Sequence, residues 1–445
     1  MGLFDNLRNW LLEPLLGREM VEKAVGVEKR REYRHGDHKK PIKSADDVVI
    51  VNFIGLIVDR SVANLFGKEP DFDLPGEAED APQVYIDDVW RANDKMKLLK
   101  TLALYGAESG TVYLKLLPDG AVDKSGKLIP RLVALDPTTV KMDTLAEDAD
   151  TVIRYTIAYG IKDPVTEKDK FIKQVIEAQD GNWVIRDYVS TNASKWELTN
   201  EAAWEWDFAP ILHAQNLPEP GTPYGRPDIS DDLIELQDRI NFVSSNTAKI
   251  LKYHAHPKTW GRGNLANKTQ VQWGADEMVM YADPNATIQN LEMQSDLGSS
   301  LNFMRYLRQA LFDISRSVDL DSIADKVGAL TNFGLRVLYQ DAISKIEEKR
   351  GLYGDLLVEA NRRLLILAGL GDDGGEIIWA DVLPVNEIER TTALRTDLEL
   401  GLVSKQTASQ KRGYDWEEEE TRIADEKAAG DNLGAALLRT FGQGG

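Results

Sequence analysis

The sequence contains no cysteine, only five histidines and no long apolar run. The absence of cysteine excludes disulfide bonds and thiolate metal sites, and it indicates a reducing compartment. So few histidines leave little material for a histidine-based catalytic centre. No stretch approaches about 18 uninterrupted apolar residues, so we expect a soluble protein that does not contact a membrane.

The N-terminal segment is not typical of a secretion signal. In MGLFDNLRNWLLEPLLGREM, residues 1–20, the apolar run is interrupted by Asp5, Arg8 and Glu13, and no small-residue cleavage site follows. The spacing of the leucines predicts a short amphipathic helix docked on the body instead. The basic stretch that comes next, residues 28–43, is predicted to be a mobile or peripheral arm.

Positive charge is outweighed by negative charge, because the chain of 445 residues has 53 Lys and Arg against 73 Asp and Glu, a formal net charge of −20. Sequence-specific DNA-binding proteins are usually basic, since neutralising phosphates supplies much of their affinity. We therefore do not expect this chain to grip nucleic acid over a broad face, and solubility is the simplest use of the charge. With 42% hydrophobic residues, the chain can bury a sizeable core in about two to four structural units.

The period of the apolar residues separates helical from strand-rich parts in the first half. Steps of three and four predict helices at 45–67, closed by Gly67, and at 84–105. From 111 to about 214 the period is two, which predicts strands, and the Asp-Gly pair at 180–181 marks a hairpin turn. We expect a mostly antiparallel sheet rather than a doubly wound fold.

Helices return in the second half of the chain. Apolar residues at steps of three and four predict long helices at 229–252, at 297–318 and from about 331 to 368. The apolar stripe of the first has almost a heptad period, as in a helix packed lengthwise on a neighbour. Residues 254–296 are irregular, and 386–445 is predicted to be helical and polar. Together with the sheet, these helices predict an α+β fold.

Two glycine-rich stretches imitate nucleotide-binding motifs. GAVDKSGKL, residues 120–128, resembles a phosphate-binding P-loop, but the spacing is one residue too long and Leu128 stands where magnesium binding needs Ser or Thr. It also lies between two predicted strands, so we interpret it as a hairpin turn. GRGNLA, residues 261–266, lacks the surrounding βαβ unit of a dinucleotide site.

Metal and catalytic motifs are equally weak. His254 and His256 could share a metal but have no third ligand nearby, and Asp319, Asp321 and Asp325 lack a partner motif for magnesium. No Ser-His-Asp order and no isolated carboxylate pair stands out. We therefore expect no catalytic residues, no metal and no cofactor.

The loop PEPGTPYGRP, residues 218–227, precedes the first long helix. Asp228 and Ser230 are predicted N-caps, and Asp231 and Asp232 complement the positive end of the helix dipole. These acids would repel a phosphate placed there. We interpret the loop as structural, because it directs and caps the helix.

This loop and helix resemble the head of the stem helix in portal proteins of tailed double-stranded DNA phages, the siphophage-type head-to-tail connectors. The family phrase is a Gly, a small or basic residue, an Asp two places on, and a long amphipathic helix that carries an Asn. The matching residues are Gly225, Arg226, Asp228 and Asn241.

Two further segments are similar to the same family, in the same order along residues 45–370. The early helix of the family ends in Phe-Gly-Lys followed by Pro, and here these residues are Phe66, Gly67, Lys68 and Pro70. The segment that begins VGALTNFGLRVLYQ, residues 327–340, is similar to the helix after the family's tunnel loop. The usual Ser-Gly phrase is replaced there by residues 331–334, Thr-Asn-Phe-Gly.

The resemblance implies a portal fold with long stem helices, a mostly antiparallel β wing, a small α/β clip and a helical C-terminal crown. The implied parts are an N-terminal helix and arm (1–44), a wing (45–227), a stem helix (228–252), a clip (253–296), a second stem helix (297–317), a tunnel loop (318–330), a long helix with the segment after it (331–385), and a crown with the C-terminal tail (386–445).

The function implied by the resemblance is mechanical. A portal of this kind is a dodecameric ring at a unique capsid vertex of the virion, assembled in the host cytoplasm, through which DNA is packaged and later ejected. The implied partners are further copies of the chain, double-stranded viral DNA, the terminase large subunit, the major capsid and scaffolding proteins, and a head–tail adaptor protein. No membrane and no cofactor is implied.

An acidic ring would let DNA slide without sticking, so basic residues near the channel are of interest. The candidate channel-lining residues are Lys249, Lys252, His254 and His256 at the end of the stem, and Asp321, Asp325 and Lys326 in the tunnel loop. The open alternative is that the lysines are simply solvated at a helix end. Two other classes also stay open, namely another ring-forming phage head or tail assembly protein and a monomeric nucleotide-dependent enzyme.

Overall fold

The computed structural model describes the whole chain except residues 1–16, 44, 77–79, 123–127, 164–166, 256–257, 263–284, 286, 292–296, 320–331, 383–386, 415, 417 and 425–445. The chain divides into two compact units, Met1–Val382 and Leu383–Gly445. It is a mixture of helices and antiparallel sheets, so the predicted α+β class is confirmed.

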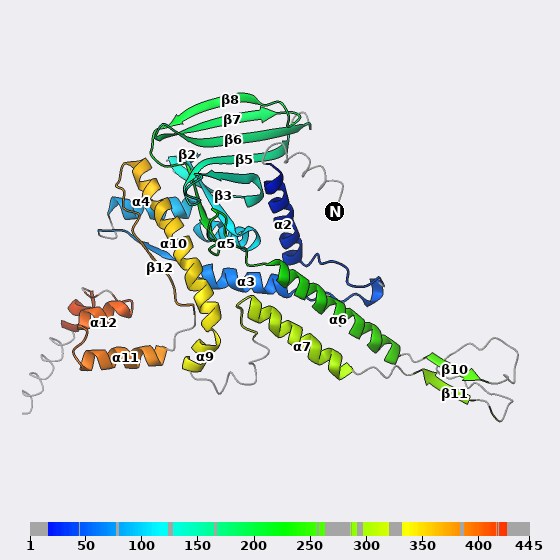
Figure 1. Cartoon of the computed structure of the whole chain (residues 1–445). Helices are drawn as coiled ribbons and strands as arrows, with labels where there is room; N and C mark the ends of the chain where they lie inside the picture. The colour runs from blue at the N-terminus through cyan, green and yellow to red at the C-terminus, as the bar shows by residue number, and fades with distance from the viewer. Residues whose placement is uncertain are drawn as a thin grey trace, which may run out of the picture. The chain divides into compact units, whose positions relative to one another are not determined.

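The α-helices of the first unit lie before and after a series of strands at 111–215, with no α-helix in the described part of that series (Figure 1). They are α2 (Arg18–His35), α3 (Phe53–Phe66), α4 (Ala81–Ala92), α5 (Lys95–Ser109), α6 (Asp231–Ala255), α7 (Leu297–Ile314), α9 (Asn332–Leu338) and α10 (Gln340–Ala368). Two short 3-10 helices, η1 (Ala45–Asp47) and η2 (Pro137–Thr139), accompany them. In the described residues, no helix is both long and apolar enough to cross a membrane.

The strands form small antiparallel sheets. They are β1 (Asp71–Asp73), β2 (Thr111–Val122), β3 (Leu128–Leu135), β4 (Val140–Thr144), β5 (Val152–Lys162), β6 (Asp169–Gln179), β7 (Asn182–Ser190), β8 (Glu197–Trp204), β9 (Ile211–Gln215), β10 (Lys258–Arg262), β11 (Thr287–Leu291) and β12 (Glu376–Ile378). The largest sheet has the order β4-β5-β6-β7-β8, a second has the order β3-β2-β9, and β1 pairs with β12 and β10 with β11. The predicted antiparallel strand region is therefore confirmed.

Two predicted turns have the expected surroundings. Asp180 and Gly181 join β6 to β7 with φ of 50° and 85°, and positive φ at both central residues is what a tight type I′ hairpin needs. The P-loop imitation falls between β2 and β3, which pair antiparallel, although its residues 123–127 lie outside the described part. Because it joins two paired strands, its interpretation as a hairpin is supported.

The main core lies between α3, α4, α5, α10 and the three-stranded sheet. Its largest fully buried side chains include Trp90, Leu102, Leu114 and Tyr353. The indole nitrogen of Trp90 donates a hydrogen bond to the amide oxygen of Asn361, at 2.7 Å, so α4 and α10 are joined by a buried polar contact as well. A separate core lies under the five-stranded sheet and includes Tyr113 and Ile157.

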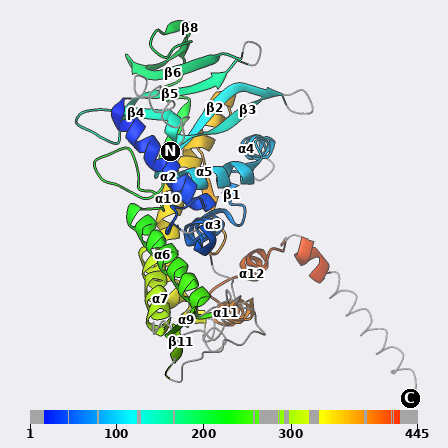
Figure 2. The ribbon, with the colours of Figure 1, turned by 90° about the vertical axis from the view of Figure 1, so that its right-hand side faces the viewer.

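The helices α6 and α7 pack side by side and extend from this core, as both ribbon views show (Figures 1 and 2). Leu233 and Ile240 of α6 meet Leu307, Leu311 and Phe312 of α7, with Ile57 of α3 at the inner end. The five-stranded sheet lies at the opposite end of the first unit. The long helices predicted at 229–252 and 297–318 are thus confirmed, with α6 starting two residues later.

Three predicted helices differ from the observed ones. Residues 48–52 are not helical, because Asn52 accepts a hydrogen bond from the backbone N–H of Gly55 at 2.9 Å and starts α3 at Phe53. The predicted helix at 84–105 is divided into α4 and α5 by Asn93 and Asp94, the latter with φ of 51°. The helix predicted from about 331 to 368 is interrupted between α9 and α10, at residue 339.

The prediction of a mobile or peripheral arm at 28–43 is wrong for its first part. Residues 28–35 belong to α2, which packs against α3 and α5 and contributes buried Tyr33 to the body. Basic residues in this helix are used for internal ion pairs, so its charge did not mark an arm.

Gly67 closes α3 with a right-handed backbone rather than the left-handed one of a typical glycine C-cap.

The second unit contains α11 (Glu387–Glu399) and α12 (Lys405–Lys411) in its described part. Ser404 caps α12, because its hydroxyl accepts a hydrogen bond from the N–H of Thr407 at 3.1 Å. Among the residues of this unit whose burial is described, most are exposed. The prediction of a polar, helical C-terminal segment is confirmed for these residues.

Candidate functional site

The loop before α6 is fixed to the body by a close contact between two glycines. A Cβ on Gly110 would lie 2.1 Å from the carbonyl oxygen of Gly225, and one on Gly225 would lie 2.5 Å from the carbonyl oxygen of Gly110. The N–H of Asp228 also donates to the carbonyl of Ala107 at 2.9 Å. The loop is therefore structural, as predicted, and it sets the position from which α6 starts.

The predicted cap residues have other roles. Ser230 stands at the N-cap position, since its carbonyl accepts from the N–H of Ile234, but its hydroxyl contacts the carboxylate of Asp232. Asp228 lies farther from the helix start, and its side chain turns into the body and is fully buried. Its prediction as an N-cap is wrong, because two lysines of α10 take up its carboxylate.

The carboxylate of Asp228 lies between Lys345 and Lys349. The ammonium of Lys349 is 2.5 Å from Oδ2 and that of Lys345 is 3.2 Å from Oδ1, and Ser61 of α3 donates to Oδ2 at 3.0 Å. We refer to these residues, with Asn216, as the Asp228 cluster; the amide of Asn216 completes it at 3.3 Å from Oδ1. The cluster joins the start of α6 to α3 and α10.

The buried charges shift each other's titration. Burial acts to raise the pKa of the Asp228 carboxyl, but the two lysines hold it well below its usual range. Burial lowers the pKa of Lys349 to about 8, although Asp228 acts in the opposite direction. One carboxylate for two ammonium groups leaves a net positive charge inside the fold when both are protonated.

A row of three buried polar residues on α6 binds the extended segment that precedes α3. Gln237, Asn241 and Ser245 are each fully buried and follow at steps of four. Phe53 N–H donates to Gln237 Oε1 at 3.1 Å, Val51 N–H to Asn241 Oδ1 at 3.1 Å and Val49 N–H to Ser245 Oγ at 2.9 Å. Gln237 and Ser245 also donate back, to the carbonyls of Val51 and Val49.

The row can bind the extended segment because the spacing of its side chains along α6 matches the spacing of every second peptide group in the segment. Four residues of a helix advance about 6 Å, and two residues of an extended chain advance about 6.6 Å. Each side chain therefore meets every second peptide group of the segment. The row replaces a missing neighbour strand, and we call it the α6 ladder. Its central residue, Asn241, is one of the residues on which the family resemblance was based.

The ladder extends into His38. The ring Nδ1 of His38 lies 2.8 Å from the side-chain nitrogen of Asn241, and Nε2 lies 2.9 Å from the carbonyl oxygen of Tyr33. Because a carbonyl can only accept, Nε2 carries the proton and Nδ1 accepts from Asn241. The chain just after α2 is thus attached to α6.

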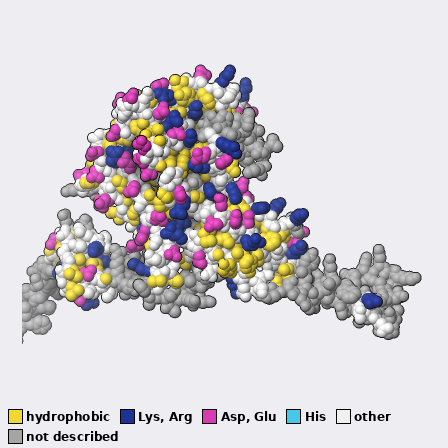
Figure 3. Space-filling view, in the orientation of Figure 1, with side chains coloured by type: hydrophobic (Ala, Val, Ile, Leu, Met, Phe, Trp, Pro, Cys, Tyr) yellow, Lys and Arg dark blue, Asp and Glu magenta, His cyan; other side chains and the backbone are white. Residues whose placement is uncertain are grey.

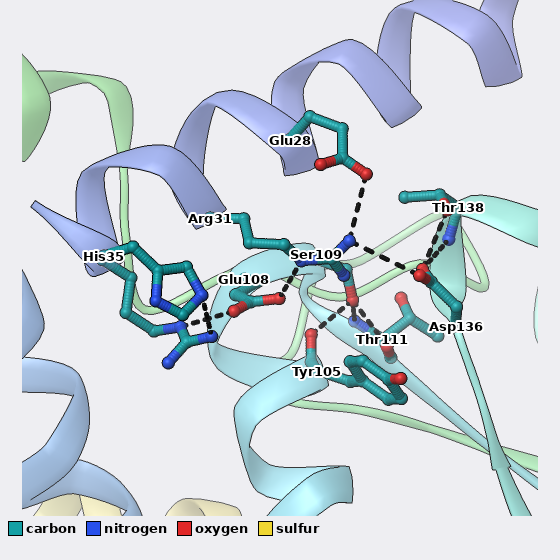
Figure 4. A network of polar contacts seen from close by, with 10 residues as sticks. Glu28, Arg31, His35, Tyr105, Glu108, Ser109, Thr111, Asp136 and Thr138 are labelled. Atoms are coloured by element: carbon teal, nitrogen blue, oxygen red, sulfur yellow. Dashed lines mark hydrogen bonds and ion pairs between the residues drawn. The ribbon is translucent and has the colours of Figure 1, made fainter. Parts of the chain in front are cut away.

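A second ion cluster attaches α2 to α5 (Figure 4). The carboxylate of Glu108, whose side chain is 2% exposed, lies 3.0 Å from Nε of Arg31 and 2.6 Å from Nε of Arg34. Arg31 also reaches Glu28 at 3.0 Å and Asp136 at 3.4 Å. We call this group the Glu108 cluster.

Large apolar side chains are exposed along both α6 and α7. Figure 3 shows hydrophobic side chains gathered over this helix pair. On α7, Leu307 and Leu311 of the predicted stripe are buried, whereas Leu301 is 43% and Ile314 49% exposed. The further exposed apolar residues of the pair are Phe242, Leu251, Phe303 and Tyr306. Within one chain, only part of the predicted apolar stripe of α7 is therefore buried.

The predicted channel-lining residues are only partly described. Lys249 is exposed on α6, and Lys252 forms an ion pair with Asp47 at 3.0 Å while its side chain is 56% exposed. His254 lies in α6, but its side chain lies outside the described part, as do the whole residues His256, Asp321, Asp325 and Lys326. The structure thus places Lys249, Lys252 and His254 on one helix end and leaves the others untested.

The two buried lysines of the Asp228 cluster were missed by sequence reasoning, although the sequence held a signal. Lys345 and Lys349 continue, at steps of four, the same face of α10 as Tyr353 and Leu357. Charged residues on an otherwise apolar helix face indicate a buried ion pair, because an unpaired charge would be expelled from it. The described residues contain no group of three or more side chains that could hold a metal ion.

Buried polar groups join the helices to one another, and the exposed apolar side chains of α6 and α7 are typical of a protein that assembles with others. The family model described as phage portal protein, SPP1 Gp6-like, matches residues 22–432, and the chain belongs to this family of tailed-phage portal proteins. Family membership assigns it to the capsid, to DNA packaging and to the head–tail connection. The family is structural and is not known as an enzyme family. None of the curated proteins matches the chain.

Proposed function

We propose that the chain assembles into a closed dodecameric ring at one capsid vertex and forms the channel through which phage DNA is packaged and ejected. The observation that carries this proposal is the exposure of Leu301 and Ile314 in the apolar stripe of α7. Large apolar side chains exposed on a long helix are typical of a surface that another protein covers. In a ring, each helix pair has a neighbour on either side, and the neighbours are copies of the same chain.

The parts of the portal fold follow from this proposal. Residues 45–227, with α3–α5 and the strands from β1 to β9, act as the wing, α6 and α7 as the stem, β10 and β11 with the residues between them as the clip, and the second unit as the crown. The clip end takes the terminase large subunit and later the head–tail adaptor, and the wing contacts the major capsid and scaffolding proteins. Assembly occurs in the host cytoplasm, and the ring becomes part of the virion.

The proposed DNA path runs past the clip end of α6 and the residues after α7. Its proposed lining residues are Lys249, Lys252, His254 and His256 near the end of α6 and, in the tunnel loop at 318–330, Asp321, Asp325 and Lys326. The formal net charge of −20 per chain keeps DNA from adhering to the ring, and the basic residues named above give weak, salt-dependent contacts to its phosphates.

The ring is tested by placing a charge in the exposed stripe. Leu301→Asp is expected to dissociate the ring, because burying a carboxylate in an apolar contact costs about 2–4 kcal/mol at every interface. The subunit number is measured by sedimentation and by electron microscopy of the purified protein. Leu198→Asp is the matched control, since Leu198 is 48% exposed but lies on β8, the edge strand of the five-stranded sheet, and not on α6 or α7.

A ring of about twelve subunits for the wild type and the control, and smaller species for Leu301→Asp, supports the proposal. A wild type that stays monomeric even with scaffolding protein, or a Leu301→Asp ring as stable as the control, would contradict the use of this surface.

A further inference from the structure

A pocket of about 180 Å³ lies where α3, the end of α7 and the start of α10 meet. One water needs only about 10–15 Å³ of such space, so the pocket has room for several waters or for one small polyatomic ion. Its charged lining residues are Arg60, Arg316 and Lys345, and Asn64, Ser317 and Tyr339 add polar groups. Among the described residues that line it, there are three cations and no carboxylate.

The positive charge of the lining is only partly neutralised from behind. Lys345 shares the single carboxylate of Asp228 with Lys349. Arg316 has one carboxylate partner, Glu348, at 3.1 Å. Arg60 donates to the carbonyl of Val318 at 2.9 Å and, within the described part of the chain, has no carboxylate partner. With Lys349 behind the lining added to Arg60, Arg316 and Lys345, four cations thus share two carboxylates, those of Asp228 and Glu348.

Donors are also left over on the pocket wall. A guanidinium has five N–H groups, and the contacts found for Arg60 and Arg316 use only part of them. The side chains of Asn64, Ser317 and Tyr339 make no hydrogen bond within the described residues. Unused donors around unneutralised positive charge match the acceptor oxygens of an anion.

The backbone at Arg316 is a second, independent sign. Its φ is 54°, in the left-handed region, and it follows the last turn of α7 in a Schellman motif: Ser317 N–H donates to the carbonyl of Phe312 at 3.0 Å. Glycine usually fills this position, and another residue costs about 1 kcal/mol there. An arginine at a position that favours glycine is accounted for if its guanidinium is needed at the pocket.

We propose that this pocket binds a tetrahedral oxyanion of the phosphate class, with Arg60, Arg316 and Lys345 as its charged ligands. Planar guanidinium groups bind two oxygens of a phosphate at once, and an ammonium adds a point charge. The bound anion neutralises the excess charge next to the Asp228 cluster and holds together the ends of α7 and α10. The site lies within one subunit and does not depend on the ring.

The anion can come from two sources with the same chemistry, a free phosphate or a backbone phosphate of nucleic acid. The test is isothermal titration of the wild-type protein with sodium phosphate, against sodium chloride at equal ionic strength, followed by thermal unfolding in both salts. A dissociation constant on the order of 1 mM is expected for so small a ligand, with a phosphate-specific rise of the unfolding temperature. A short DNA duplex that displaces phosphate would identify nucleic acid as a source, and one that does not would identify the free anion.

The variants Arg60→Gln and Arg316→Gln are each expected to weaken phosphate binding about tenfold, because one charge-assisted contact is lost. Arg91→Gln is the control, since Arg91 is an exposed arginine that pairs only with Asp88 in the described residues. Arg316, with a side chain 39% exposed, can be changed without opening the core, so it serves if Arg60→Gln does not fold. Phosphate that binds no better than chloride, or equally to Arg316→Gln and Arg91→Gln, would overturn the proposal. Sedimentation of the same samples separates this result from any failure of ring assembly.

Discussion

The Glu108 and Asp228 clusters are built alike but behave differently. In each, one buried carboxylate lies between two cationic side chains of a single helix, Arg31 and Arg34 of α2 or Lys345 and Lys349 of α10. The arginines are about one-fifth exposed, and Arg31 reaches two further carboxylates. The lysines are almost fully buried and share the one carboxylate.

The difference shows that the kind of base matters as much as the charge count. A guanidinium stays protonated at any pH a protein tolerates, so the two cations of the Glu108 cluster keep their charge. An ammonium group can lose its proton when it is buried, so the Asp228 cluster can reduce its own excess charge. The cations that join α2 to α5 therefore do not titrate, whereas the contact between the loop before α6 and α10 depends on the protonation of Lys349.

The largest expected effect comes from Asp228→Asn. This change leaves two buried ammonium groups without a counter-charge, and breaking a buried pair by removing one partner costs about 3–5 kcal/mol of unfolding free energy. Urea unfolding followed by circular dichroism measures the loss. A loss below about 1 kcal/mol would mean that the lysines are neutral or solvated, and that the cluster does not join the helices.

Glu108→Gln is expected to cost less, about 2 kcal/mol, in the same unfolding assay. Arg31 keeps Glu28 and Asp136, both arginines are partly solvated, and the glutamine oxygen still accepts one hydrogen bond. If Glu108→Gln proves more damaging than Asp228→Asn, then burial of the cation is not what distinguishes the clusters.

The smallest effect is a rise of stability with pH that depends on Lys349. Its folded pKa of about 8 lies below the ordinary value of 10.5, so between these values the unfolded chain binds more protons and stability increases as pH rises. From about pH 7 to pH 9.5 the gain is about 1–2 kcal/mol. The wild type is compared with Lys349→Met, which keeps the one-to-one pair of Asp228 with Lys345 and should lack this gain. Equal pH slopes for the two proteins would refute the assignment.

The regular parts of the fold could be predicted from the sequence because their periods are local. The alternation in residues 152–190 gives β5 to β7, and steps of three and four give α6 and α7. The charges at 28–43 led to the wrong prediction of an arm, because the sequence does not reveal that Arg31 contacts Glu108, 77 positions away. Asp228 and Lys349 are 121 positions apart, and no local pattern connects them.

The candidate site was predictable to the same limited degree. Lys249 and Lys252 were singled out as basic residues at the end of a predicted helix, and they do lie near the C-terminal end of α6, while their place in a DNA channel stays a prediction. The α6 ladder was missed, since glutamine, asparagine and serine at steps of four are equally typical of a solvated helix face. Only the extended segment at 49–53, which the sequence suggested was helical, turns them into buried ligands of a backbone.

The α6 ladder also determines how α6 would respond to a pull along its axis. Its hydrogen bonds are spaced along the axis of α6 and stand across it, so a pull on the outer end of this helix loads all of them in shear at once rather than opening them one by one. Sliding by a single residue would turn the row by about 100° and unpair every bond together. The ladder therefore holds α6 against both translation along its axis and rotation about it.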